Sequence, residues 1–279
     1  QTDKSQAYVG EQITVTYILL RRLDYQNMEV EKLPVYKGFL SEEMEIPEHV
    51  AEGIMQYKGQ RFYYQAFRKV ALFPTQSGMQ TIDPLSAKGV ILIPERDPFF
   101  GTTLFSSTQP QLVLLASNTL KINILPLPSN APSNFSGAVG QFQAQREVKN
   151  TDIAQGQSAT MSVEVKGWGN LKAVDAPKLN SNKLIEVFEP EIEDKLQKNG
   201  EIFGGIRLFN YAIVPQSSGK IIIPKDEFVY FDPLQKTYIS KDLPEITLNV
   251  IPKIGNDIVQ SSGNTFQPTL KKSFTDSTN

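Results

Sequence analysis

The chain has one histidine, His49, and it stands among acidic residues in the segment "SEEMEIPEHV" (41–50). Imidazole and carboxylate groups are ligands for divalent metal ions, so this segment raises the question of a metal centre. Metal ligands must converge on one point, and a single imidazole beside scattered carboxylates does not indicate such convergence. The carboxylates are Glu42, Glu43, Glu45 and Glu48. The sequence favours a solvated loop over a cation site.

A second acidic run, "EPEIEDK" (189–195), lies between two predicted strands. Calcium needs several oxygen ligands around a tight turn, and this run lacks the D-x-D-x-D-G pattern. We therefore predict a charged loop here. Paired carboxylates for glycoside hydrolysis are defined in space, and no aromatic-flanked acidic motif singles out such a pair.

The segment "GWGNLK" (167–172) invites comparison with a phosphate-binding loop. No third glycine follows at the required spacing and no helical pattern comes after it. We predict a tight turn between strands, with Trp168 packed or partly exposed at the end of a sandwich. The alternative is that Trp168 contacts a ligand or partner.

Composition excludes further chemistry. The chain has no cysteine, so thiol catalysis, zinc thiolate sites and disulfides are excluded. Its 28 basic and 30 acidic residues give a net charge of −2 without a dense basic run, which argues against nucleic acid. No stretch approaches the roughly 20 apolar residues that cross a bilayer. We predict no catalytic residues, no bound metal and no cofactor, and hence a protein that is not an enzyme.

One insertion gathers aromatic residues. The segment "ERDPFFGTTLFSSTQ" (95–109) carries Phe99, Phe100 and Phe105 among turn-forming and hydroxyl residues. Burying one such side chain is worth about 1.5–3 kcal/mol, so the three rings should pack somewhere. They either fold back on the protein or dock a partner.

Periodicity decides the fold class. "EQITVTYILL" (11–20) alternates apolar and polar residues as a half-buried strand does. The helix-like stretch 41–53 is interrupted by Pro47. The other predicted strands are 61–73, 87–94, 111–116, 119–126, 157–167, 184–190, 206–215, 220–224, 227–233 and 244–252. The prediction is an all-β protein.

The two halves repeat one another. "FRKVALFPTQSGMQTID" (67–83) has its counterpart in "LFNYAIVPQSSGKIIIP" (208–224), and in each a strand ends at a proline and a glycine follows four residues later. "VGEQITVTY" matches "AQGQSATMSVEV", and "LKINILP" matches "ITLNVIP". We predict two tandem Ig-like antiparallel β-sandwich domains, 1–127 and 128–252, and a polar tail or linker, 253–279. The central stretch "SNFSGAVGQFQAQREV" (133–148) would be both the end of the linker and the first strand of the second domain.

Several segments together resemble the BatD proteins, the oxygen-tolerance family of Bacteroides-type bacteria. They are "YVGEQITVTYILL", "LFPTQSGMQTIDP", "LPSNAPSNFSGAVGQF", "GWGNLKAVDAPKL", "IEVFEP" and "FVYFDP", and they cover residues 6 to about 252. "FSGAVGQF" and "GNL" followed by a proline are the more specific elements.

The resemblance implies a cell-envelope protein of the periplasm, anchored in the inner membrane when full-length, with several Ig-like modules. It implies partners encoded in the same operon, the von Willebrand A-type membrane proteins, and a link to aerotolerance. We expect this chain to be two interior modules, with membrane association only through segments outside it. The resemblance supplies no catalytic residues.

Two functions follow. The first is a non-catalytic extracytoplasmic scaffold or interaction module, with Phe99, Phe100, Phe105 and Trp168 as candidate partner contacts. The alternative is a carbohydrate- or surface-binding adhesin-like protein, because tandem sandwiches often serve in that role. A row of exposed aromatic residues or a calcium site would favour the alternative.

Overall fold

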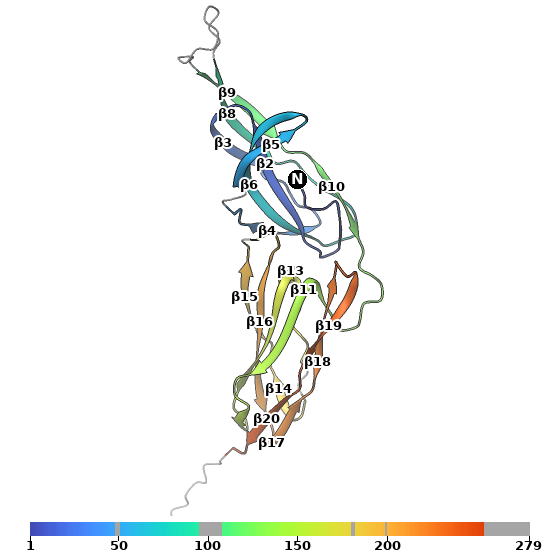
Figure 1. The fold of residues 1–279 in the computed structure, drawn as a ribbon. Helices are drawn as coiled ribbons and strands as arrows, with labels where there is room; N and C mark the ends of the chain where they lie inside the picture. Colours follow the sequence, from blue (N-terminus) through green and yellow to red (C-terminus); the bar gives the residue numbers. More distant parts are fainter. Residues whose placement is uncertain (48–50, 95–107, 180–181, 199, 254–279) are drawn as a thin grey trace, which may run out of the picture.

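The structure is a computed structural model that describes residues 1–47, 51–94, 108–179, 182–198 and 200–253 of the 279-residue chain. Within them the protein is all-β, with two β-sandwich domains placed end to end (Figure 1). The first domain contains β1 (Gln6–Tyr8), β2 (Ile13–Arg21), β3 (Tyr25–Lys32), β4 (Phe39–Met44), β5 (Glu52–Tyr57), β6 (Gln60–Pro74), β7 (Gly78–Ile82), β8 (Ser86–Pro94), β9 (Thr108–Ala116) and β10 (Leu120–Leu125). The second contains β11 (Phe135–Val148), β12 (Asp152–Ala154), β13 (Ala159–Gly169), the 3₁₀ turn η1 (Leu171–Ala173), β14 (Ile185–Val187), β15 (Glu191–Gln197), β16 (Gly204–Pro215), β17 (Gly219–Ile223), β18 (Asp226–Asp232), β19 (Thr237–Leu243) and β20 (Ile246–Ile251).

Each domain buries the apolar side of its alternating strands. In the first, Ile13 and Val15 of β2 are fully buried and pack with Ile122 and Ile124 of β10. In the second, Val163 and Val165 of β13 are fully buried in the same way, within a core that includes Leu248 of β20. The period of two therefore predicted the buried faces as well as the strands.

The first domain has three sheets in the order β2-β6-β4, β1-β10-β7 and β3-β8-β9, with β5 pairing β6. The second has one sheet in the order β14-β16-β13-β11-β18-β19, with β15 pairing β16, and a second sheet in the order β12-β20-β17. Pairing is mostly antiparallel. The exceptions are β1 with β10, β12 with β20 and β11 with β18.

The two domains share one register. Ile13 pairs with Leu72 in the first, and Ala159 pairs with Ile213 at the corresponding place in the second. The parallel pair Gln6 with Asn123 corresponds to Asp152 with Asn249. The predicted internal repeat therefore extends to individual strand partners.

The predicted proline-to-glycine turns coincide. β6 ends at Pro74 and β7 begins at Gly78 with φ +107°, while β16 ends at Pro215 and β17 begins at Gly219 with φ +106°. The backbone N–H of Gly10 donates to the carbonyl of Pro74 at 2.8 Å. In the second domain the N–H of Gly156 donates to the carbonyl of Pro215 at 2.9 Å.

Three local predictions are wrong. The acidic segment before His49, predicted as a solvated loop, begins within a strand, because residues 41–44 belong to β4, which pairs with β6. The acidic run 189–195 is not a loop but enters β15, which pairs with β16 along its whole length. Trp168 lies inside β13, opposite Gly204, and the chain turns only after Gly169.

The central stretch forms β11 from Phe135 onward, as its alternating apolar residues predict. The chain passes between the domains over residues 126–134 (Figure 1). The strands up to Leu125 pair only with one another, as do those from Phe135, within the described residues.

Candidate interaction surface

The β8–β9 hairpin projects from the first domain, away from the second (Figure 1). The two strands pair from Ser86 with Ala116 to Pro94 with Thr108. The equivalent β18–β19 hairpin closes earlier, pairing Asp232 with Thr237. The projecting hairpin therefore belongs to the first domain alone, and the predicted insertion 95–109 begins at its end.

The outer face of this hairpin is apolar. Leu112 and Leu114 of β9 point to one side of the strand, and their exposed fractions are 64% and 75%. β9 is the last strand of its sheet within the described residues, so one of its edges carries no strand. An edge strand that exposes neighbouring leucines is a surface that another protein can cover.

The equivalent positions in the second domain carry different side chains. Register places Tyr238 where the first domain has Leu112, and Ser240 where it has Leu114. Tyr238 packs edge-on against Phe135 and Phe231, with ring centroids 5.1 and 5.3 Å apart. Ser240 donates a hydrogen bond to Glu227 at 2.8 Å. In the second domain, therefore, the ring of Tyr238 is packed against other rings and the neighbouring outward position is a serine. In the first domain both positions are exposed leucines.

The cover over Phe231 comes in part from the first domain. Tyr8 meets Phe231 edge-on with ring centroids 5.0 Å apart. Gly10 lies so close to Val139 that an added Cβ would be 2.8 Å from its Cγ2. The two domains therefore touch along an apolar contact beside the linker.

A second contact joins the domains through a small core. Phe203 and Phe73 are almost completely buried and meet edge-on at 5.7 Å, together with Met44 and Ala71. The side-chain amide of Gln12, which is 7% exposed, bonds from the first domain to the segment around Phe203. Its oxygen accepts the N–H of Phe203 at 2.7 Å, and its nitrogen donates to the carbonyl of Glu201 at 3.2 Å. These contacts fix how the hairpin is held relative to the second domain.

Charged groups border the same joint. Glu42 of β4 binds Lys198 of the second domain at 3.2 Å and also accepts a hydrogen bond from Lys172. Burial raises the pKa of Glu42, but the bonds to the two lysines outweigh it and the pKa lies below its ordinary value. Lys69, with 6% of its side chain exposed, pairs with Glu201 at 3.2 Å.

The predicted site residues are separated by the structure. Phe99, Phe100 and Phe105 lie outside the described residues, as does His49. Trp168 is 43% exposed, and its ring covers Gly204, where an added Cβ would lie 2.6 Å from the indole. Its role as a partner contact stays a prediction, and its packing on Gly204 gives it a structural role beside that one.

The acids near His49 are not all solvated. Glu42 is held by two lysines and Glu43 by Arg68. Among the described residues no three metal-ligating side chains gather in one place. Within the same residues no helix is long and apolar enough to cross a membrane.

Leu112 and Leu114 were not singled out from the sequence. The signal for them is present in "QLVLLA" (111–116), because a strand apolar at successive positions must turn one apolar face outward unless both faces are covered.

The described residues form a tandem pair of Ig-like β-sandwiches, and the first of them has an exposed apolar edge strand. Residues 146–250 match the family described as the BatD DUF11-like domain. The match covers most of the second domain, and over these residues it confirms the resemblance to the BatD family. No curated protein matches the chain.

Proposed function

We propose that this chain is a non-catalytic, extracytoplasmic scaffold of a BatD-family protein linked to aerotolerance. Its two domains hold a partner-binding hairpin, β8–β9, at a fixed distance and orientation. The partners are von Willebrand A-type membrane proteins of the same operon, and the full-length protein is anchored in the inner membrane.

The exposed leucines of β9 carry this proposal. Large apolar side chains in a contiguous stripe on an edge strand are uncommon on a surface that stays free. A partner strand or loop that covers Leu112 and Leu114 would remove them from water and satisfy the free edge of β9. The joint supports the same proposal, because a buried phenylalanine pair and a buried glutamine hold the two domains in one arrangement.

The adhesin-like alternative gains less support. A row of exposed aromatic residues would favour this alternative. Among the described residues, the exposed aromatic side chains are divided between the two domains. Tyr57 and Tyr63 lie on the β5–β6 hairpin, whereas Trp168 and Phe188 belong to the second domain. Arg21 also stacks on Tyr63, with its guanidinium carbon 5.3 Å from the ring centroid.

The proposal is tested with the double variant Leu112→Ser and Leu114→Ser, which gives β9 the serine that the second domain has at Ser240. Exposed positions rarely change stability by more than about 0.5 kcal/mol, so the variant should melt close to the parent. Its affinity for the purified von Willebrand A-type protein should fall roughly tenfold or more, as expected for apolar residues central to an interface.

The matched control is Leu234→Ser. Leu234 is 75% exposed in the turn between β18 and β19, the place in the second domain that corresponds to the hairpin end. It should bind like the parent. Unchanged binding by the double variant, or an equal loss in the control, would overturn the hairpin as the docking surface.

A further inference from the structure

The first domain has an open strand edge at β2. β2 pairs with β6 on one side, and on the other side the first residues of the chain are the only described ones that pair with it. Thr2 forms a bridge with Val15, and the N–H of Thr16 donates to the carbonyl of Gln1 at 2.9 Å. Beyond Thr16, no described strand runs along this edge.

In the second domain, the equivalent edge, that of β13, is paired with a full strand. There, β11 pairs with β13 from Val148 opposite Met161 back to Gly140 opposite Gly169. The shared register makes Val148 with Met161 the equivalent of Thr2 with Val15. Gln1–Asp3 therefore occupies the place of the end of β11, and no described strand takes the place of Gly140–Arg146 beside β2.

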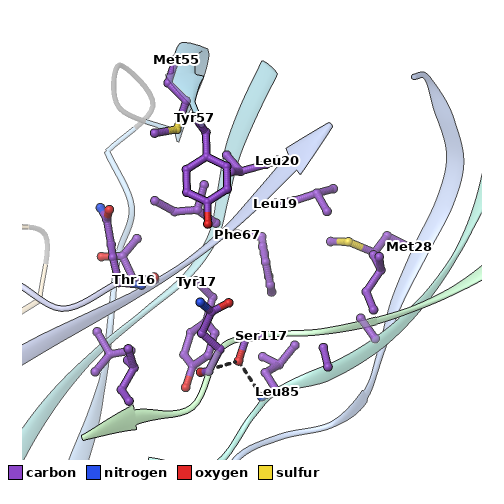
Figure 2. Close-up of a pocket in the computed structure, with 18 residues that line it drawn as sticks. Thr16, Tyr17, Leu19, Leu20, Met28, Met55, Tyr57, Phe67, Leu85 and Ser117 are labelled. Atoms are coloured by element: carbon purple, nitrogen blue, oxygen red, sulfur yellow. Dashed lines mark hydrogen bonds between the residues drawn. The ribbon is translucent and has the colours of Figure 1, made fainter. Parts of the chain in front are cut away.

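A cavity of about 500 Å³ lies beside this edge. Tyr17 and Leu19 of β2 line one side, and Met28, Phe67 and Tyr57 surround it (Figure 2). Leu85 and Ser117 close its lower end in the same view. The lining is mostly apolar, so a side chain that enters it gains by leaving water.

In the second domain a side chain of β11 fills the corresponding space. Phe142 is 3% exposed and meets Phe228 and Tyr230 edge-on, with ring centroids 6.4 and 5.6 Å apart. Register places Ala87 and Gly89 of the first domain at the positions of Phe228 and Tyr230. The smaller residues leave room for a large side chain from an added strand.

The surroundings of Arg146, the basic residue of β11, also have a counterpart in the first domain. Arg146, 6% exposed, donates to the carbonyls of Pro224 and Leu243 at 2.7 and 3.3 Å and also to that of Pro244. The equivalents of these residues in the first domain are Asp83, Ser117 and Asn118, and the last two line the cavity. In the shared register, the position equivalent to Arg146 comes directly before Gln1.

We propose that the open edge of β2 and its cavity take one extended strand of the β11 type, joined to Gln1 on its N-terminal side. It runs antiparallel to β2 and pairs with Ile18 and Leu20, the residues that face the same way as Thr16. Alternate residues are apolar and enter the cavity, and a basic residue beside Gln1 reaches the carbonyls near Ser117. The proposal is independent of the partner surface on β9.

The test extends the full chain at Gln1 with the seven residues of Gly140–Arg146, "GQFQAQR". Amide hydrogen exchange is then measured at Ile18 and Leu20. We expect their exchange to slow at least tenfold, because their N–H groups gain strand partners, and the melting temperature to rise by several degrees.

The matched control carries the same extension with proline at the positions of Gln143 and Gln145, which removes two donors and keeps the apolar residues. It should exchange like the unextended chain. The proposal is overturned if all three proteins exchange alike at Ile18 and Leu20. It is also overturned if light scattering shows that the unextended chain is a dimer in which these amides are already protected, since a second copy would then hold the edge.

Discussion

At the scale of single residues, the polar groups at the joint determine how firmly the domains are held. Gln12 is the most constrained of them, because it is buried and uses both ends of its amide. Glu42 is the one whose contribution depends on pH. Its side chain is 16% exposed, and its carboxylate is bonded to Lys172 and Lys198.

We predict that Glu42→Gln lowers the free energy of unfolding at pH 7 by about 1 kcal/mol, since both lysines remain partly exposed. The folded pKa of Glu42 lies below its ordinary value of 4.5, so its contribution is complete above pH 4.5 and is lost as the pH falls through the folded pKa. Urea unfolding of parent and variant should therefore differ at pH 7, and the difference should shrink as the pH is lowered from 4.5 towards 3.

The control for this prediction is Glu193→Gln. Glu193 pairs with Lys195 at 3.3 Å, and both side chains are more than half exposed. This variant should match the parent at both pH values. A Glu42→Gln defect that persisted undiminished at pH 3 would assign the loss to packing instead of charge.

None of these residue contacts could be predicted from the sequence. Glu42 and Lys198 are 156 positions apart, and Gln12 and Phe203 are 191 apart. Local periodicity describes how a strand faces its own core, and it carries no information about which domain surface meets another. The segment around Glu42 was interpreted as solvated for that reason.

At the scale of elements, the repeated turns give a matched test. Gly78 and Gly219 have nearly the same positive φ, and an added Cβ at either would meet nothing within 4 Å. We predict that Gly78→Ala and Gly219→Ala each destabilise the protein by about 1–2 kcal/mol, because an L residue is strained at positive φ and no clash contributes.

Chemical denaturation of the two single variants measures both values. The two losses should agree within about 0.5 kcal/mol, the usual error of additivity between distant sites. A large loss in one domain with none in the other would show that the turns are equivalent in geometry and not in energy.

The strands that the sequence predicted are those with one buried face. β2, β13 and β16 show this pattern, and their partners follow from the repeat. β6 was also predicted, although its end is buried on both faces, with Leu72 in the core of the first domain and Phe73 in the contact with the second. β15 was missed because "EIEDKLQ" is exposed at six of its seven positions and carries charge on both faces. β4 and β3 were missed for a similar reason, since both lie largely at the surface and are rich in glutamate.

The exposed face of the candidate hairpin was equally hard to predict. The run 111–116 identifies a strand, but its exposure depends on whether another element covers it. In the second domain the linker covers Tyr238, whose hydroxyl donates to the carbonyl of Pro128 at 2.8 Å. The first domain leaves Leu112 without such cover among the described residues.

At the scale of the whole molecule, the joint makes two repeats into one elongated body (Figure 1). A scaffold needs a fixed arrangement of its domains, because a binding hairpin on a freely rotating domain would not be held in one orientation towards its partner. The contacts that supply it are the Phe73–Phe203 core, the Gln12 amide and the ion pairs of Glu42. Added salt weakens the ion pairs between the domains, but it does not screen the apolar contact between Phe73 and Phe203.

We predict that the parent unfolds in one transition and that Phe203→Ala separates it into two. Phe203 is fully buried, and removing such a ring costs about 3–5 kcal/mol, all of it at the contact between domains. Calorimetry makes the distinction, because the van't Hoff and calorimetric enthalpies agree only for a single cooperative unit. Phe203→Leu, which keeps most of the apolar contact with Phe73, should retain one transition. Two transitions in the parent, or one in the alanine variant, would mean that the buried core does not couple the domains.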